Sequence, residues 1–235
     1  MSSVCLLCDY KLGADAQLLE PMHIFVCEWC EPEAKTLSPE VVRTLLALDG
    51  IRPSFAVWDH GRREDSREEK LETPQPQPAE ILPSAVPGLF VGDLDDVANV
   101  AHLQELGIGF VLNLCPKKLG GHYSDLPRQL GAAGIAHLAW PAEDHYNYDI
   151  VAEVVERGAL DFIEAGLRSG RVLVNCWGGV NRSASVAVAY AVLRRRVALV
   201  EAVASTMARR GTVLTNRAFR LQLVRVAIEK GCPLG

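Results

Sequence analysis

A cysteine, an arginine and two serines lie close together in the stretch NCWGGVNRSAS, residues 175–185. Cys176 is followed by two glycines and, six residues later, by Arg182 and then Ser183. Glycines let the backbone turn without side-chain obstruction, so that successive N–H groups can converge on one point. A guanidinium binds two oxygens of one anion, and the N-terminus of a following helix adds positive potential. The spacing predicts a phosphate-sized anion site next to a cysteine.

The donors of such a site favour the thiolate form of Cys176 at neutral pH. The thiolate could attack a bound phosphorus atom in line and form a phosphocysteine, while Arg182 and the backbone amides stabilise the charge on the equatorial oxygens. Ser183 is placed to hydrogen-bond the thiolate and help it leave in a second, hydrolytic step. Trp177 either lines the pocket or packs under the loop. The loop residues expected to contact the anion are Trp177, Gly178, Gly179, Val180 and Asn181.

An alkoxide is a poor leaving group, so this chemistry also needs a general acid. The candidate is Asp144 in WPAEDHYNYD, a loop that follows a predicted strand and should emerge at the same sheet edge as Cys176. It would protonate the leaving oxygen and later deprotonate the attacking water. Glu143 is the alternative, and position alone leaves the choice between the two open.

Strands and helices alternate after residue 87, which predicts an α/β fold with a central, mostly parallel sheet and helices on both faces. In this arrangement RVLVN, residues 171–175, is the strand that leads into the anion loop. The other expected strands are residues 88–93, 108–114 and 135–140, and the expected helices are residues 94–107, 149–168, 183–195, 198–210 and 215–230.

Several segments together resemble the dual-specificity branch of the cysteine-dependent protein phosphatases, over most of residues 87–230. The similar segments are VPGLFVGDLDDVANVAHLQELGIGFVLNL, AWPAED, the C-x5-R-S loop, SASVAVAYAVL and TNRAFRLQL. The resemblance implies hydrolysis of phosphotyrosine and of phosphoserine or phosphothreonine in protein substrates, with Asp144 as the acid and without a metal in catalysis. It also implies that Asn113 braces the loop and that Cys115 could form a protective disulfide with Cys176; a buried structural cysteine is the alternative for Cys115.

One residue departs from that family pattern. Asn175 stands where the family usually has the histidine that precedes the nucleophile. An amide could still hydrogen-bond the backbone around the loop, but the departure allows a second reading, a catalytically weak or inactive phospho-binding adaptor. Apart from Arg182 the loop has no basic residue, which disfavours highly phosphorylated inositol lipids as substrates.

Four cysteines near the start of the chain form two C-x-x-C pairs, Cys5 with Cys8 and Cys27 with Cys30. This spacing is typical of a four-thiolate zinc site, in which each pair forms a knuckle and a hairpin brings the two knuckles together. His23 is a weaker alternative ligand. The zinc would be structural, and the module would either stabilise the N-terminal region or recruit a protein partner.

These patterns divide the chain into a zinc-binding module at residues 1–36, a helix at 37–57, a charged and proline-rich linker at 58–86 and a catalytic domain at 87–232. Most of the acidic excess lies before residue 87. This acidic part could fold back on a loose group of arginines, which consists of Arg209, Arg210, Arg217 and Arg220.

The 235 residues are 49% hydrophobic, which suffices for one sizeable core. A net charge of -5 and an acidic zinc module argue against nucleic-acid binding. No apolar run approaches the roughly 18 residues that a membrane span needs, and the first residues lack the pattern of a signal peptide. We therefore expect a protein of the cytoplasm, with the nucleus as an alternative.

Overall fold

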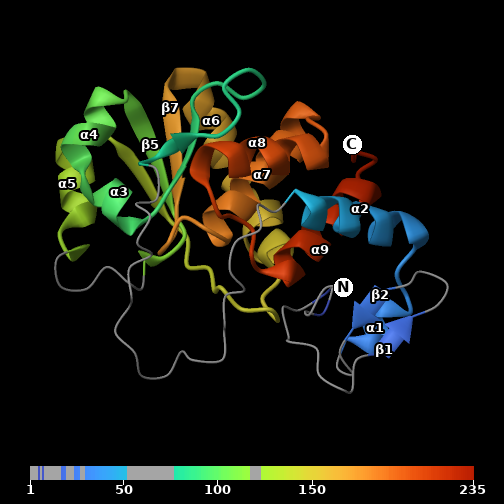
Figure 1. Ribbon diagram of the computed structural model, residues 1–235. Helices are drawn as coiled ribbons and strands as arrows, with labels where there is room; N and C mark the ends of the chain where they lie inside the picture. The colour runs from blue at the N-terminus through green and yellow to red at the C-terminus, as the bar shows by residue number, and fades with distance from the viewer. Residues whose placement is uncertain are drawn as a thin grey trace.

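Strand β7 lies at the centre of a five-stranded sheet in the computed structural model of the chain (Figure 1). The strand order is β3-β4-β7-β5-β6, and β7 pairs in parallel with both β4 and β5. Strand β6 extends the parallel pairing, whereas β3 pairs antiparallel with β4 at the edge, so the predicted mostly parallel sheet is confirmed. The strands are β3 (Ala79–Glu80), β4 (Leu89–Gly92), β5 (Ile108–Asn113), β6 (Ala136–Ala139) and β7 (Arg171–Asn175).

The structure describes only part of the chain. The linker predicted at residues 58–86 lies largely outside it, as do Cys8, His23 and Cys27. The described residues are 5, 7, 17–19, 24–26, 30–51, 77–116 and 123–235.

Helices cover both faces of the sheet, as expected (Figure 1). The alternation of side chains along β7 explains the two layers, because Val172 and Val174 pack into one core cluster and Leu173 packs into the other. The helices of the smaller layer are α3 (Leu94–Ala98), α4 (Val100–Glu105) and α5 (Leu126–Ala132). Those of the larger layer are the π-helical segment η4 (Val151–Ala159), α6 (Leu160–Ser169), α7 (Arg182–Arg195), α8 (Leu199–Arg210) and α9 (Arg217–Glu229).

Two helices differ from the sequence prediction in how they are divided. The helix predicted over residues 94–107 is broken at Asn99, whose side-chain oxygen accepts the His102 N–H and begins α4. The helix predicted over residues 149–168 is kinked at Gly158, where φ is 120°. Helix α5 is an element that the sequence analysis did not identify. None of the helices formed by described residues has a stretch long and apolar enough to span a bilayer.

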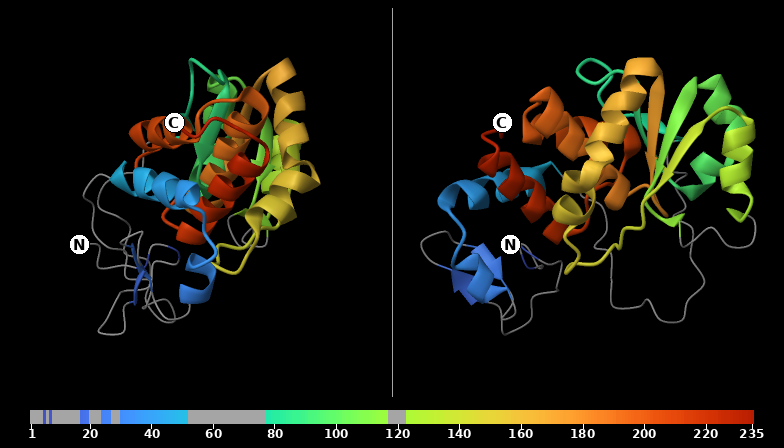
Figure 2. Two further views of the ribbon diagram at one scale, coloured as in Figure 1. Left: turned by 90° about the vertical axis from the view of Figure 1, so that its right-hand side faces the viewer. Right: turned by 180° about the vertical axis from the view of Figure 1, so that it is seen from behind.

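The N-terminal region contributes a small hairpin and two helices. Helix α2 begins as predicted, because the Ser38 side chain accepts the Val41 N–H and Pro39 occupies the first turn. Its apolar side packs against α9 and α8, and Figure 2 shows it lying across these helices. The elements are β1 (Gln17–Leu19), which pairs antiparallel with β2 (Ile24–Val26), then α1 (Glu31–Ala34) and α2 (Pro39–Gly50).

The sheet begins earlier in the chain than residue 87. Strand β3 and the buried side chains of Ile81, Leu82 and Val86 belong to the folded domain, although they fall in the range 58–86 that the sequence analysis assigned to a linker. The Ile81 carbonyl also accepts the Ser205 hydroxyl of α8. Strand β3 has only two residues and follows a proline-rich run, so no alternating hydrophobic pattern marks it in the sequence.

Gly166 is where α6 comes close to the sheet, and it provides a test of this packing. A Cβ at this position would lie 2.5 Å from Cγ2 of Val172 and 2.9 Å from Cγ of Phe110. We expect Gly166→Ala to destabilise the fold by roughly 1–3 kcal/mol through overpacking. Gly131→Ala on α5, where a Cβ has open space, should instead stabilise it by about 0.5–1 kcal/mol. Urea unfolding of both variants measures these changes, and equal effects would contradict the proposed close packing.

Candidate active site

Cys176 directly follows β7 and is the first residue of a loop of residues 176–181, and α7 begins at Arg182. The Cys176 N–H donates to the Gly92 carbonyl at 3.4 Å, and the Trp177 carbonyl accepts the Leu94 N–H at 3.2 Å. The loop is therefore tied to the end of the neighbouring strand β4. The first turn of α7 faces this loop without a side-chain cap, which leaves helix N–H groups there for an anion.

The two glycines of the loop play different roles. Gly179 has φ +64°, a conformation that favours glycine. A Cβ at Gly179 would collide with the guanidinium of Arg210 and with the backbone of Gly92. Gly178 does not have a positive φ, and a Cβ there would meet only Val180 at 3.8 Å. Of the two glycines expected to let the backbone turn, only Gly179 therefore has a positive φ.

The fully buried Arg210 side chain lies against Gly179. Its Nη2 atom is 3.0 Å from Oδ2 of Asp93, and its Nη1 atom is 3.0 Å from Oδ2 of Asp96. The two aspartates also cap α3 reciprocally, each accepting the other's backbone N–H. Burial raises the pKa of Asp96 to about 6, although Arg210 favours its charged form. Arg210, which we expected in a loose group of arginines on which the acidic N-terminal part could fold back, instead lies inside the protein.

Cys176 and Ser183 lie together at the base of the loop. The Cys176 side chain is 1% exposed, and its Sγ atom is 3.2 Å from the hydroxyl of the buried Ser183. An O–H donor at this distance can stabilise a thiolate. The structure therefore brings together the two residues to which the sequence analysis gave the nucleophile and leaving-group roles.

Arg182 and Asp144 are also close to each other. The Arg182 Nη1 atom donates to the Ala142 carbonyl at 3.2 Å, and its Nε atom is 3.9 Å from Oδ2 of Asp144. The loop that carries Asp144, residues 140–149 (the acid loop), thus approaches the arginine that is expected to bind phosphate. Glu143, the alternative acid, is exposed and has no hydrogen bond to residues 176–183 within the described part of the chain.

Asn181 joins the acid loop to the start of α9. Its side-chain nitrogen donates to both carboxylate oxygens of Asp144, at 3.3 and 3.2 Å. Its side-chain oxygen accepts the Thr215 hydroxyl and the Asn216 N–H, at 3.1 and 2.9 Å. Asn216 donates a further hydrogen bond to Asp144 at 3.2 Å. The segment TNRAFRLQL pointed to this region, but sequence reasoning assigned no role to Thr215 or Asn216.

The side-chain amide of Asn175 is buried without a hydrogen bond to the loop. It is fully buried, and among the described residues neither its nitrogen nor its oxygen has a hydrogen-bond partner. The hydrogen bonds that this amide could have made to the loop backbone are therefore absent among the described residues. On the next strand, Asn113 accepts the N–H of Cys115, whose thiol is buried; the disulfide of Cys115 with Cys176 stays a prediction. Trp177 is 37% exposed, which agrees better with a place at the pocket rim than under the loop.

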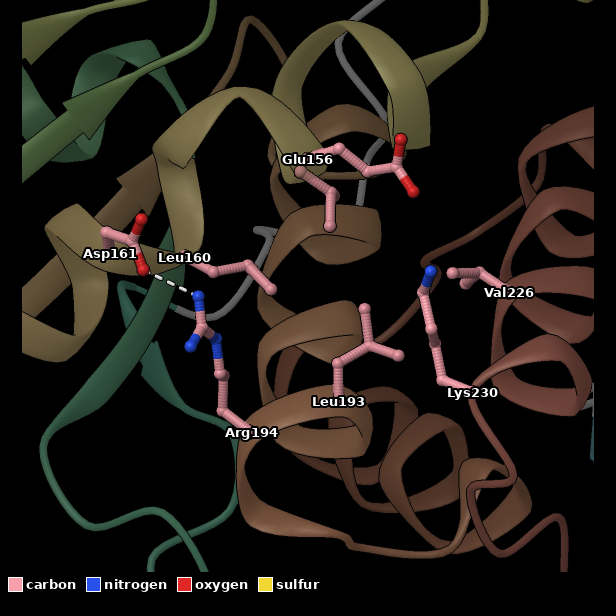
Figure 3. A pocket seen from close by; sticks show the side chains of 8 residues that line it. Glu156, Leu160, Asp161, Leu193, Arg194, Val226 and Lys230 are labelled. Atoms are coloured by element: carbon pink, nitrogen blue, oxygen red, sulfur yellow. Dashed lines mark hydrogen bonds and ion pairs between the residues drawn. The ribbon is translucent and has the colours of Figure 1, made fainter.

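A separate hollow of about 310 Å³ lies between η4, α6, α7 and α9 (Figure 3). Its rim carries both signs of charge, and Arg194 pairs with Asp161 across it. Leu193, on its wall, lies about three turns along α7 from Arg182. The lining residues are Val155, Glu156, Leu160, Asp161, Leu193, Arg194, Val226 and Lys230, so this hollow shares no residue with the loop of Cys176.

Comparisons with known proteins agree with this geometry. The family model described as "Dual specificity phosphatase, catalytic domain" matches residues 89–228, and the chain belongs to this family. Dual specificity protein phosphatase 26 of Bos taurus is 37% identical over 140 residues, which are 59% of this chain and 63% of that protein. Human dual specificity protein phosphatase 4 is 34% identical over 152 residues, which are 63% of this chain and 34% of that protein.

The chain thus spans less than two thirds of the length of these relatives. The crystal structure of human DUSP28 has the same fold, with a TM-score of 0.56 at 24% sequence identity, and covers 68% of this chain and 98% of its own. Helix α2 and the N-terminal cysteines lie outside the residues that the family model matches.

The contact of Gly179 with Arg210 can be tested by substitution. We expect Gly179→Ala to destabilise the protein by on the order of 1–3 kcal/mol, because alanine is strained at positive φ and its Cβ collides with the guanidinium. Gly178→Ala is the matched control and should change stability by less than about 0.5 kcal/mol. Thermal unfolding of both variants measures the difference. A Gly179→Ala variant as stable as Gly178→Ala would show that Arg210 does not pack against the loop.

Proposed function

We propose that this protein is a phosphoprotein phosphatase that hydrolyses phosphotyrosine and phosphoserine or phosphothreonine through a phosphocysteine intermediate. One observation carries the proposal: the Cys176 thiol lies 3.2 Å from the Ser183 hydroxyl at the base of a glycine-containing loop that ends at Arg182, beside Asp144. A nucleophile, an anion-binding arginine and an acid meet at one sheet edge. Catalysis on this scheme needs only the chain's own residues.

In the first step, the Cys176 thiolate attacks the phosphorus of the bound phosphate ester. A phosphorus–sulfur bond forms and the phosphorus–oxygen bond to the leaving group breaks. Arg182 and the N–H groups at the start of α7 stabilise the charge on the equatorial oxygens. Asp144, held by Asn181 and Asn216, gives its proton to the leaving oxygen.

In the second step, water attacks the phosphorus of the phosphocysteine. Asp144, now a carboxylate, takes a proton from this water, and the phosphorus–sulfur bond breaks. The Ser183 hydroxyl donates to the departing Cys176 sulfur, which stabilises the thiolate. Inorganic phosphate is released and the starting thiolate is restored.

The residues around the loop support protein substrates of both kinds. Trp177 is exposed beside the nucleophile and offers an aromatic surface to a peptide. Arg182 is the only basic residue among residues 176–183, too few for a highly phosphorylated lipid headgroup. We propose a location in the cytoplasm, with the nucleus as an alternative, because a catalytic thiol needs reducing conditions.

The alternative function, a weak or inactive phospho-binding adaptor, rests on the departure from the family pattern at Asn175, whose buried amide has no hydrogen-bond partner among the described residues. Without a hydrogen bond from this side chain, the loop that carries the thiolate is held by one contact fewer. The adaptor would keep the anion site and lose the turnover.

The deciding experiment is phosphate release from an aryl phosphate and from phosphopeptides. We expect Cys176→Ser to lose activity by at least about 1,000-fold, because the nucleophile is removed. Asp144→Asn should lose roughly 100-fold or more on phosphoserine peptides and less on the aryl phosphate, whose leaving group needs less protonation. Cys232→Ser, which changes a buried cysteine outside the site, is the matched control and should keep its activity.

Each outcome of this experiment favours one function. Activity that survives in Cys176→Ser would contradict the cysteine mechanism. An inert wild-type protein that still binds phosphopeptide would favour the adaptor.

We further propose that Cys5, Cys8, Cys27 and Cys30 bind one structural zinc ion. The two C-x-x-C pairs and the hairpin of β1 and β2 between them support this proposal. Cys5 is buried and Cys30 packs partly buried against the same core cluster, as knuckle cysteines would. Among the described residues no group of three metal-binding side chains is found, and two of the proposed ligands lie outside that part of the chain. A partner protein of this module is part of the same proposal.

The zinc proposal predicts a stoichiometry. The purified chain should contain one zinc per molecule, and Cys27→Ser should lose most of it, because a site with three thiolates holds zinc more weakly. Elemental analysis of both proteins measures this, with Cys115→Ser as a control that should keep the metal. Zinc-free wild-type protein, purified without chelator, would contradict the proposal.

A further inference from the structure

Asp49, near the C-terminal end of α2, joins the N-terminal region to the first turn of α9. Its Oδ2 atom is 2.9 Å from Nη1 of Arg217, and its Oδ1 atom accepts a hydrogen bond from Nη1 of Arg220. The three side chains are only 22%, 3% and 5% exposed. The expectation that the acidic N-terminal part folds back on these arginines is confirmed for Arg217 and Arg220.

The position of these arginines makes a counter-charge necessary. Both lie in the first turn of α9, where the helix dipole is unfavourable for a cation, and both are nearly buried. A buried guanidinium is stable when it is paired and hydrogen-bonded. Asp49 supplies negative charge to both arginines at once, and it comes from a helix outside the residues that the family model matches.

From Arg220 a short series of hydrogen bonds leads to the anion loop. The Nε atom of Arg220 donates to the Leu214 carbonyl. Leu214 has φ +54°, which is strained for a residue with a Cβ, and its own N–H donates to the Val180 carbonyl at 2.9 Å. The contact with Arg220 therefore holds a strained residue in the orientation that braces the loop.

The two residues that follow Leu214 are connected by hydrogen bonds to Asp144, the proposed general acid. Thr215 and Asn216, which follow Leu214, hold the side chain of Asn181, and Asn181 and Asn216 both donate to Asp144. A displacement of residues 214–216 would thus move both the loop and the carboxylate.

We propose that Asp49 is a positioning residue for the anion loop and for Asp144, and that α2 through this residue is part of the catalytic unit. The proposal deepens the proposed phosphatase function and rests on it. Asp49 touches no reacting atom; it acts through Arg220, Leu214 and the Asn181 contacts.

The test compares Asp49→Asn with Glu33→Gln in the full chain. Glu33 also connects the N-terminal region to α9, through a 2.8 Å ion pair with Arg225, but both partners are about half exposed and Arg225 lies beyond the first turn. We expect Asp49→Asn to lower kcat/KM about tenfold for 4-nitrophenyl phosphate, and by more for phenyl phosphate, because a displaced Asp144 affects poor leaving groups most. Glu33→Gln should change neither value by more than about twofold.

A second measurement follows the loop without turnover. Inorganic phosphate should slow the alkylation of Cys176 by iodoacetate, and this protection should need several-fold more phosphate in Asp49→Asn than in the wild type or in Glu33→Gln. If the wild type is inert but shows this difference, the phosphatase proposal fails while the role of Asp49 stands. If the wild type is active and Asp49→Asn matches it in both leaving-group dependence and protection, the role of Asp49 is overturned.

Circular dichroism and thermal unfolding establish that each variant is folded at the assay temperature. Should Asp49→Asn not fold, Asp49→Glu replaces it, since it keeps the charge but lengthens the side chain. We then expect a two- to threefold lower kcat/KM with the same stronger loss on phenyl phosphate. Wild-type values for Asp49→Glu on both substrates would overturn the proposal.

Discussion

The contact of the buried Arg210 guanidinium with Gly179 is the constraint on which the anion loop depends. If the N–H groups of the loop point toward a bound anion, the other side of its backbone packs against the protein. At Gly179 this backbone lies directly against the Arg210 guanidinium, because glycine has no side chain to separate the two. Asp93 and Asp96 balance the charge of Arg210, and they also begin α3 at the end of β4. One small cluster therefore connects strand, helix and loop, and a larger residue at Gly179 would disturb all three.

A second point of convergence lies at Asn181, the last residue of the loop. Asn181 accepts hydrogen bonds from the segment before α9 and donates to Asp144, so a single amide connects the proposed general acid to the loop of Cys176. An amide suits this position because it offers donors and an acceptor together. Arg182 adds a contact to the Ala142 carbonyl, so that the acid loop is attached by uncharged as well as charged groups.

Much of the fold and the grouping of the candidate site residues could be predicted from local patterns. The hydrophobic runs of the strands and the C-x5-R-S spacing are visible along the chain, and the sheet brings Cys176, Arg182, Ser183 and Asp144 together as the alternation of strands and helices requires. Contacts that depend on tertiary structure could not be predicted in this way. The break at Asn99, the burial of Arg210 and the contacts of Asn216 each depend on partners distant in the sequence. Asn175 is a case in which the residue type alone misleads. Its amide is able to form hydrogen bonds, but it has no partner among the described residues.

The docking of α2 has a consequence for where the folding unit ends. Val41, Leu45 and Leu48 are buried in the same core cluster as α8 and α9, so the family domain of residues 89–228 does not cover its own apolar surface. A fragment limited to those residues would present that surface to solvent, and association between fragments would compete with folding. The N-terminal helix and the family domain therefore share one apolar core, although only the second of them is matched in a sequence comparison.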